Sequence, residues 1–290
     1  MKVITRKLAL TICLAFMLAS ATPALAGPPL VMLDGAGGVG VNPTAWITSS
    51  TTDTSFLDGW INKPSVAMWY GTFSEIDTAF SAFGLNFGVK DRVELSWGHQ
   101  RASIENGPDI ELDSFGCKVL LLKENDFDSP FVPALSVGIT YRTNHDIGGS
   151  GSTDDDGFEY YAVASKVITQ FPLVPMILSA GVSYTDAYQR GVLGFNDDDE
   201  DFVYMLDVAW VVPLFPKQKF FHAMVPGFEY RSGADYDNDW RDADTWDVFA
   251  DFMVTDNIII AVGYLWNGDP DSKNRVGFGD CPFFMIDIDW

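Results

Sequence analysis

The sequence predicts an all-β chain that folds as a transmembrane antiparallel up-and-down β-barrel. Three observations predict it: an apolar export signal at the N-terminus, twelve later segments of strand composition, and a last strand that alternates with period two. Helices and closed barrels are the structures whose backbone hydrogen bonds are satisfied within a bilayer. No stretch after Ala26 has the ~20 apolar residues that a spanning helix needs, so a barrel is expected.

The first 26 residues have the parts of a cleaved signal peptide. Three cations among the first seven residues precede an apolar run, Leu8–Leu18, and an A-x-A cleavage site ends at Ala26. The sequence therefore divides into a signal peptide (1–26), a Gly-rich N-terminal segment (27–64) and the barrel (65–290). The middle segment is predicted to be a plug, a periplasmic piece or a source of extra strands.

The composition narrows the function classes. The formal net charge is −22, and it becomes about −25 once the three cations of the signal are removed. This balance argues against nucleic-acid binding, and it favours divalent cations, cationic solutes or solubility of the loops. Export permits a disulfide between Cys117 and Cys281, but the sequence leaves that pairing open.

Twelve segments from Ser65 onward have the composition and the length of tilted membrane strands. They are 65–74, 78–89, 92–104, 111–123, 132–143, 158–169, 176–188, 202–212, 222–233, 244–254, 257–267 and 280–290. The alternation is clear in several of them, but in 65–74 and 158–169 the phase is ambiguous. The prediction is twelve strands, and fourteen is the alternative if Thr44–Ser50 forms an additional strand that pairs with an upstream strand.

The connections between these segments alternate in kind. Short or compact ones, such as Lys90-Asp91, take turns with long Gly/Asp-rich ones such as 144–157, 190–201 and 233–244. Outer-membrane barrels have short periplasmic turns and long extracellular loops. The parity therefore predicts a periplasmic C-terminus and acidic loops on the outside.

The last eight residues carry a resemblance of their own. Phe284, Ile286, Ile288 and Trp290 share one face of the strand, and Asp287 and Asp289 share the other. A chain that ends on an aromatic residue in this way resembles the closing strand of bacterial outer-membrane barrels. The resemblance implies that Trp290 belongs to an insertion signal, that the barrel-insertion machinery and membrane lipids are partners, and that the location is a Gram-negative outer membrane.

A second resemblance covers about residues 33–142. It rests on Gly35–Gly40 before Asn42-Pro43-Thr44-Ala45-Trp46, on Phe83-Gly84-Leu85, and on Asp91-Arg92-Val93-Glu94-Leu95-Ser96. These stretches are similar to an uncharacterised family of exported Gram-negative barrel proteins, a domain of unknown function. The chain departs from that pattern in a longer insertion at Thr51–Lys63. The resemblance implies fold and location, and it transfers no catalytic residues.

Charged residues at the polar parity are predicted to face the lumen, because a charge that faces lipid at mid-depth costs ~2–4 kcal/mol. The predicted lumen charges are Glu94, Lys118, Arg142, Asp207, Glu229, Arg231, Asp247, Asp251, Asp287 and Asp289. Their acidic excess favours cations in an open pore. The alternative, a plugged lumen in which these charges pair, stays open.

Other motifs point to chemistry only weakly. Asp235, Asp237 and Asp239 have the spacing that opens a calcium loop, but Trp240 stands where that loop needs Gly. Loop-bound Ca²⁺ or Mg²⁺ is therefore an alternative to the expectation of no cofactor. A barrel hydrolase that uses His99 would lack an identifiable third catalytic residue.

The predicted function is accordingly a non-enzymatic, narrow, passive channel for small solutes with a weak cation preference. The alternative is a closed structural or binding barrel whose acidic extracellular loops bind cations. A barrel hydrolase is the third hypothesis.

Overall fold

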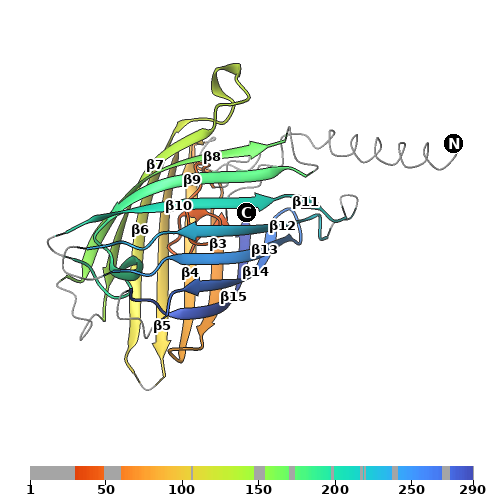
Figure 1. Cartoon of the computed structure of the whole chain (residues 1–290). Helices are drawn as coiled ribbons and strands as arrows, with labels where there is room; N and C mark the ends of the chain where they lie inside the picture. The colour runs from red at the N-terminus through yellow and green to blue at the C-terminus, as the bar shows by residue number, and fades with distance from the viewer. Residues whose placement is uncertain are drawn as a thin grey trace, which may run out of the picture.

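The computed structural model describes residues 30–48, 60–105, 107–146, 154–169, 174–196, 199–215, 218, 220–236, 241–269 and 275–289. Within these ranges the chain forms one closed antiparallel barrel with a short two-stranded hairpin inside it (Figure 1). None of the described helices is long and apolar enough to cross a membrane.

Twelve strands form the barrel wall, each paired with its neighbours in sequence order. They are β3 (Ser65–Phe73), β4 (Thr78–Val89), β5 (Val93–Ile104), β6 (Asp109–Leu122), β7 (Ala134–Asn144), β8 (Asp156–Ile168), β9 (Met176–Thr185), β10 (Asp201–Trp210), β12 (Ala223–Arg231), β13 (Thr245–Met253), β14 (Ile258–Asn267) and β15 (Gly279–Asp289). The short β11 (Val212–Pro213) adds to the end of β12. The prediction of twelve strands is thus confirmed.

The barrel closes where its last strand meets its first. On β15 and β3, Phe284 lies opposite Tyr70, and Met285 lies opposite Trp69. Two 3₁₀ turns, η2 (Asp126–Asp128) and η3 (Tyr188–Gly191), lie in connections between strands. Cys117 and Cys281 are free thiols, so no disulfide joins them.

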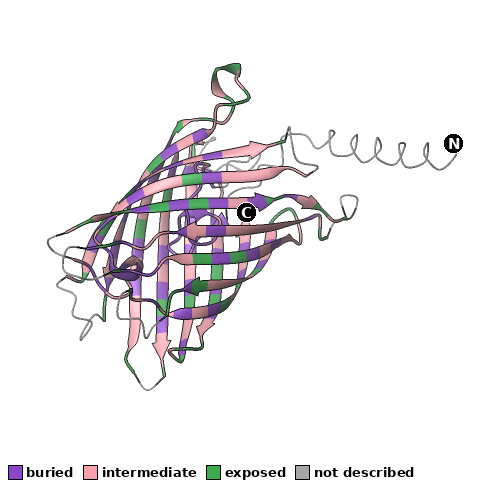
Figure 2. Cartoon of the chain, viewed as in Figure 1, coloured by how far each residue is buried: buried purple, intermediate pink, exposed green. Residues whose placement is uncertain are grey.

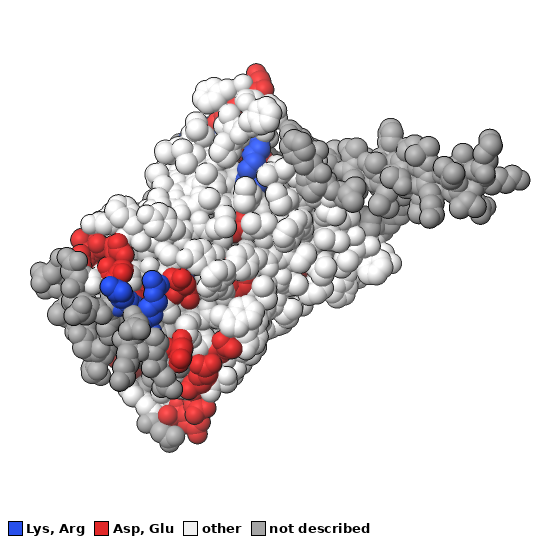
Figure 3. All heavy atoms as spheres, viewed as in Figure 1, with Lys and Arg blue, Asp and Glu red and all other residues white. Residues whose placement is uncertain are grey.

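Buried residues alternate with more exposed ones along much of the barrel wall, as the burial colours of the strands show (Figure 2). On β7, Ser136, Thr140 and Arg142 are buried, whereas Val137 between them is exposed. The outer face carries many exposed aromatic side chains, including Phe115, Tyr160 and Tyr204. In the view of Figure 3 the charged side chains gather toward the two ends of the barrel, and the wall between them is largely uncharged.

The described part of the Gly-rich segment, residues 30–48, lies inside the barrel, and we call it the plug. Its strands β1 (Leu30–Val31) and β2 (Gly37–Gly38) pair as a small antiparallel hairpin. Leu30 and Val31 pack in an apolar cluster with Ala67, Trp69, Ala82, Ile259, Ala261 and Met285 of the wall. A second cluster joins Ala45 and Ile47 to Leu120, Ala134, Tyr161, Val163 and Met205. The plug therefore fills much of the lumen.

Candidate functional site

Most of the charged residues that the sequence assigned to the lumen are buried in the structure. Nine of the ten predicted residues are buried in the barrel, and Asp289, near the end of the last strand, is half-buried. The buried nine are Glu94, Lys118, Arg142, Asp207, Glu229, Arg231, Asp247, Asp251 and Asp287. Buried charges need partners, and for most of these residues the partner is the plug.

The first contact with the plug is a pair of opposite residues on β5 and β6. Lys118 Nζ lies 3.1 Å from Glu94 Oε2, and it donates a hydrogen bond to the Gly37 carbonyl at 2.9 Å. Glu94 accepts hydrogen bonds from the Gly37 N–H at 2.7 Å and from the Thr48 N–H and hydroxyl at 2.9 and 2.7 Å. A Cβ on Gly37 would lie 2.0 Å from Thr48 Oγ1, so this close approach requires glycine.

The second contact is a chain of alternating charges. Asp34 of the plug lies 2.9 Å from Arg142 of β7 and 3.3 Å from Arg190 of η3. Arg142 also lies 2.8 Å from Glu159 of β8, and Glu159 pairs in turn with Arg231 of β12. Burial lowers the pKa of the Arg190 guanidinium to about 10, so it still carries its charge at neutral pH.

The third contact is a row of carboxylates. Asp207, Glu229 and Asp247 lie directly opposite one another across β10, β12 and β13. Glu229 accepts hydrogen bonds from the main-chain N–H groups of Val41 and Asn42, each at 3.0 Å. The Asn42 side-chain amide donates to Asp207 at 2.6 Å. The plug thus offers donors to two of the three carboxylates.

Several carboxylate oxygens of the wall are left without a donor. Asp287 accepts a hydrogen bond from the Val31 N–H at 2.8 Å through one oxygen, but its other oxygen has no partner. Both oxygens of Asp247 and one oxygen of Asp251 also lack an N–H or hydroxyl donor within the described residues. We call Asp207, Glu229 and Asp247, together with the nearby Asp251, the carboxylate row; within it, Asp247 and Asp251 receive the fewest donors.

Sequence reasoning missed three of the residues that hold the plug. Asp34 lies in a segment without strand alternation, and Arg190 lies in a loop, so neither had a predicted face. Glu159 lies on the segment 158–169, whose phase is ambiguous, but its charge could have shown which face of that strand points inward. A carboxylate at mid-strand that faced lipid would be costly, so Glu159 fixes the inner face of β8.

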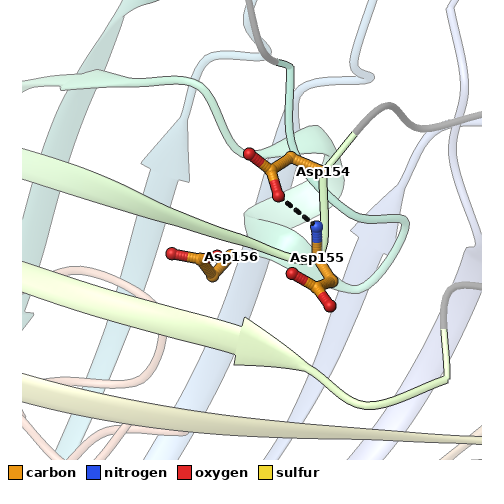
Figure 4. Close-up of side chains that lie close together, drawn as sticks. All are labelled: Asp154, Asp155 and Asp156. Carbon is orange, nitrogen blue, oxygen red and sulfur yellow. Dashed lines mark hydrogen bonds between the residues drawn. The ribbon is translucent and has the colours of Figure 1, made fainter.

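The acidic loops bring some carboxylates together. Oxygens of Asp154, Asp155 and Asp156 lie within 4.8 Å of one another, and the Asp155 N–H donates to Asp154 Oδ1 at 2.8 Å (Figure 4). Exposed acidic neighbours of this kind do not by themselves define a metal site.

Parts of two predicted sites lie outside the described residues. Of the predicted calcium loop, Asp237 and Asp239 are among these, and so is Trp290. Asp235 is described, and its carboxylate lies 2.7 Å from Arg241 Nε. A cation at Asp235 would therefore compete with a guanidinium.

His99 does not form the arrangement that a serine hydrolase needs. Its Nδ1 lies 3.1 Å from Asp113 Oδ1, and the other Asp113 oxygen lies 2.9 Å from His145. Ser103 is four residues farther along β5, opposite Asp109. The geometry therefore pairs the histidine with a carboxylate and not with a nucleophile.

Comparison with known proteins gives a family but no function. The family model described as "Protein of unknown function (DUF3034)" matches residues 28–274. No curated protein sequence matches the chain.

Among solved structures, the chain is similar to a NanC porin (TM-score 0.47, 13% identity, covering 78% of this chain and 98% of that one). It is also similar to a KdgM porin (TM-score 0.47, 11% identity, covering 78% of this chain and 99% of that one). A third similar structure is a COG4313 outer membrane channel from Pseudomonas putida F1 (TM-score 0.46, 11% identity, covering 83% of this chain and 99% of that one). All three TM-scores are below 0.5, so these likenesses transfer neither substrates nor residue roles to this chain.

Proposed function

The chain belongs to the family described as a protein of unknown function (DUF3034), and on that premise we propose that it is an outer-membrane barrel that acts as a plugged passive channel for small solutes. The observation that carries the proposal is the polar character of the wall beneath the plug. Removal of the plug would uncover buried charged residues, which suit a water-filled lumen better than an apolar core.

The outer surface supports the membrane location. Exposed aromatic and aliphatic side chains such as Tyr70, Phe115 and Tyr204 are expected on a wall that faces lipid. The turns at the end where β15 finishes include the short connections 90–92 and 254–257, and the long acidic loops lie at the opposite end. We propose that the first end is periplasmic, that Trp290 belongs to the insertion signal, and that the acidic loops face outward.

The charge of the wall supports a cation preference. The lumen carboxylates described above are Glu94, Glu159, Asp207, Glu229, Asp247, Asp251, Asp287 and Asp289, and the cations are Lys118, Arg142 and Arg231. An unplugged lumen would therefore attract cations and repel anions. Because the plug fills the lumen, the resting protein is expected to be closed and to conduct only when the plug moves.

The second candidate is a barrel that stays closed and whose acidic loops bind divalent cations. The apolar clusters around Val31 and Ile47 favour it, because the plug buries apolar side chains that it would lose on leaving. Calcium titration followed by tryptophan fluorescence tests the loop. A saturable change below millimolar calcium that is weakened in Asp235→Asn would support loop binding, and a flat titration would remove it.

Conductance of the refolded full mature chain in planar bilayers separates the two candidates. The channel proposal expects rare openings in the wild type and more frequent openings in Asp34→Asn, which loses the charge that pairs with Arg142 and Arg190. Asp109→Asn is the matched control, because Asp109 pairs with Arg101 on the partly exposed outer face. If neither the wild type nor Asp34→Asn conducts, although both form folded, heat-modifiable barrels, the result would favour the closed barrel over the channel.

A further inference from the structure

A cavity of about 150 Å³ lies between the plug and the end of the barrel that carries the long loops. Leu33, Gly40 and Val41 of the plug form one side of it, and Gln189 and Arg190 of η3 form another. The remaining wall comes from the loop-side halves of β3 to β6 and of β13 to β15. The cavity thus exists only because plug, loop and barrel meet.

Most of the cavity wall is apolar and much of it is aromatic. Trp69, Phe80, Phe278 and Phe283 line it, and the rings of Trp69 and Phe283 lie 5.5 Å apart between centroids. An engineered apolar cavity of similar size in another protein binds benzene. The cavity is therefore large enough for a single ring or a short aliphatic chain.

Two buried polar side chains with incomplete hydrogen bonding reach this apolar cavity. Asp247 is fully buried; its carboxyl shares a hydrogen bond with the carboxyl of Glu229, and no N–H or hydroxyl group of the described residues donates to it. Gln100 is 4% exposed, and its side-chain Nε2 has no acceptor there. An unpaired buried polar group costs about 1–3 kcal/mol, and a ligand that paired with these groups would recover that cost.

The charges around the cavity indicate the sign of the ligand. Asp247 lies opposite Glu229, Asp251 follows it on the same strand, and none of these carboxylates forms an ion pair with the described lumen cations. Arg190, the cation at the cavity, is already engaged by Asp34 and by the Val41 carbonyl. A ligand cation would meet a group of carboxyls that no cation of the described residues pairs with, whereas a ligand anion would meet repulsion.

We propose that this cavity binds a small amphipathic amine, with an aromatic or short aliphatic body against Trp69 and Phe283 and a protonated amino group that donates to Asp247. The Gln100 amide offers a hydrogen bond to an acceptor or a ring face of the same ligand. This site goes beyond the proposed channel, because equilibrium binding at the cavity does not require the plug to move.

Ligand-observed ¹⁹F NMR on the full mature chain in nanodiscs tests the site, with empty nanodiscs as the blank. The probes are 4-fluorobenzylamine, which is charged at pH 7, and neutral 4-fluorobenzyl alcohol. We expect saturable binding of the amine that unlabelled benzylamine displaces. Asp247→Asn should weaken the amine by roughly tenfold or more, because charge-assisted hydrogen bonds are about twice as strong as neutral ones. Binding of the alcohol should change by less than about threefold.

Ala102→Phe supplies a steric test, because Ala102 lines the cavity and is buried. The larger side chain should abolish binding of both probes, and Asp109→Asn on the outer face should change neither. Heat modifiability on a gel checks that each variant folds. If Ala102→Phe does not fold, the binding measurement on Asp247→Asn alone tests the site. Amine binding no better than in empty nanodiscs, or unchanged in Asp247→Asn, would overturn the site while leaving the channel proposal intact.

Discussion

Arg142 of the barrel wall lies 2.9 Å from Asp34 of the plug, and the side chains of both residues are almost fully buried. The same guanidinium lies 2.8 Å from Glu159, so one arginine joins two wall strands to the plug. The N-terminal segment is therefore held by specific charges in addition to apolar contact. This arrangement makes the attachment of the plug accessible to mutation.

Loss of the arginine should destabilise the folded barrel. Arg142→Met would leave Asp34 and Glu159 with fewer partners, and removal of one member of a buried pair typically costs about 3–5 kcal/mol. The free energy of unfolding, measured by urea titration of the reconstituted protein, should fall by about that amount. The double variant Asp34→Asn/Arg142→Met should be less damaged than the sum of the two single variants predicts. Strict additivity would show that the pair does not act as a unit.

The close fit of the plug against the wall should make Gly37 intolerant of any side chain. A Cβ there would lie 2.0 Å from Thr48 Oγ1 and 2.6 Å from Glu94 Oε2. Gly37→Ala should therefore lower the temperature at which the folded gel band converts to the unfolded one. Gly107→Ala, in an exposed loop, is the control. Equal conversion temperatures for wild type and Gly37→Ala would mean that the plug does not sit against Glu94.

The two strands of ambiguous phase are explained by the plug. In β3 the inner residues Ala67 and Trp69 are apolar because they pack against Val31 of the plug, while Met68 on the outer face is also apolar. In β8, Tyr161 and Val163 are apolar for the same reason. Apolar and polar residues alternate along a barrel strand only where its inner face meets water, so the pattern is lost where the plug covers that face with apolar side chains. The sequence predicted strands and closure well, because these depend on local pattern and turn parity.

The plug contacts were harder to foresee than the wall. The inner charges follow from strand parity, and the family resemblance is confirmed by the match over residues 28–274. The partners of those charges are main-chain groups of residues 30–48, such as the N–H groups of Gly37 and Val41. A main-chain donor has no sequence signature, and contacts more than 50 residues apart in sequence follow from tertiary structure alone. The fourteen-strand alternative is wrong. Of the segment Thr44–Ser50, the described residues 44–48 bond to wall side chains and do not extend the sheet.

The carboxylate row should set the ion selectivity of any conducting state. Asp251 has an oxygen without a donor within the described residues, so its charge is poorly compensated by its neighbours. Asp251→Asn should shift the reversal potential in a potassium chloride gradient toward zero, because the acidic excess of the lumen falls by one. Asp109→Asn serves again as the control at the outer face. An unchanged potential in Asp251→Asn would place the ion path away from β13.

The loop that carries Arg190 should make stability depend on pH through Asp186. This residue follows β9, and burial raises the pKa of its carboxyl from 3.8 to about 6. One of its oxygens has no hydrogen-bond donor within the described part of the chain, which is consistent with a carboxyl that resists ionisation. The folded state then holds its proton more tightly than the unfolded state does. The stability that the folded state gains by holding the Asp186 proton is fully present below about pH 4 and is lost as the pH rises to about 6.

Asp186→Asn removes that titration while keeping the size and the acceptor oxygen of the side chain. The variant should unfold at higher urea concentration than the wild type at pH 7.5, and the two midpoints should converge near pH 4. Other buried carboxylates titrate equally in both proteins, so the difference between the two urea midpoints isolates Asp186. A difference that is constant from pH 4 to pH 7.5 would mean that the pKa of Asp186 is the same in the folded and unfolded states, and that its oxygens find donors that offset its burial.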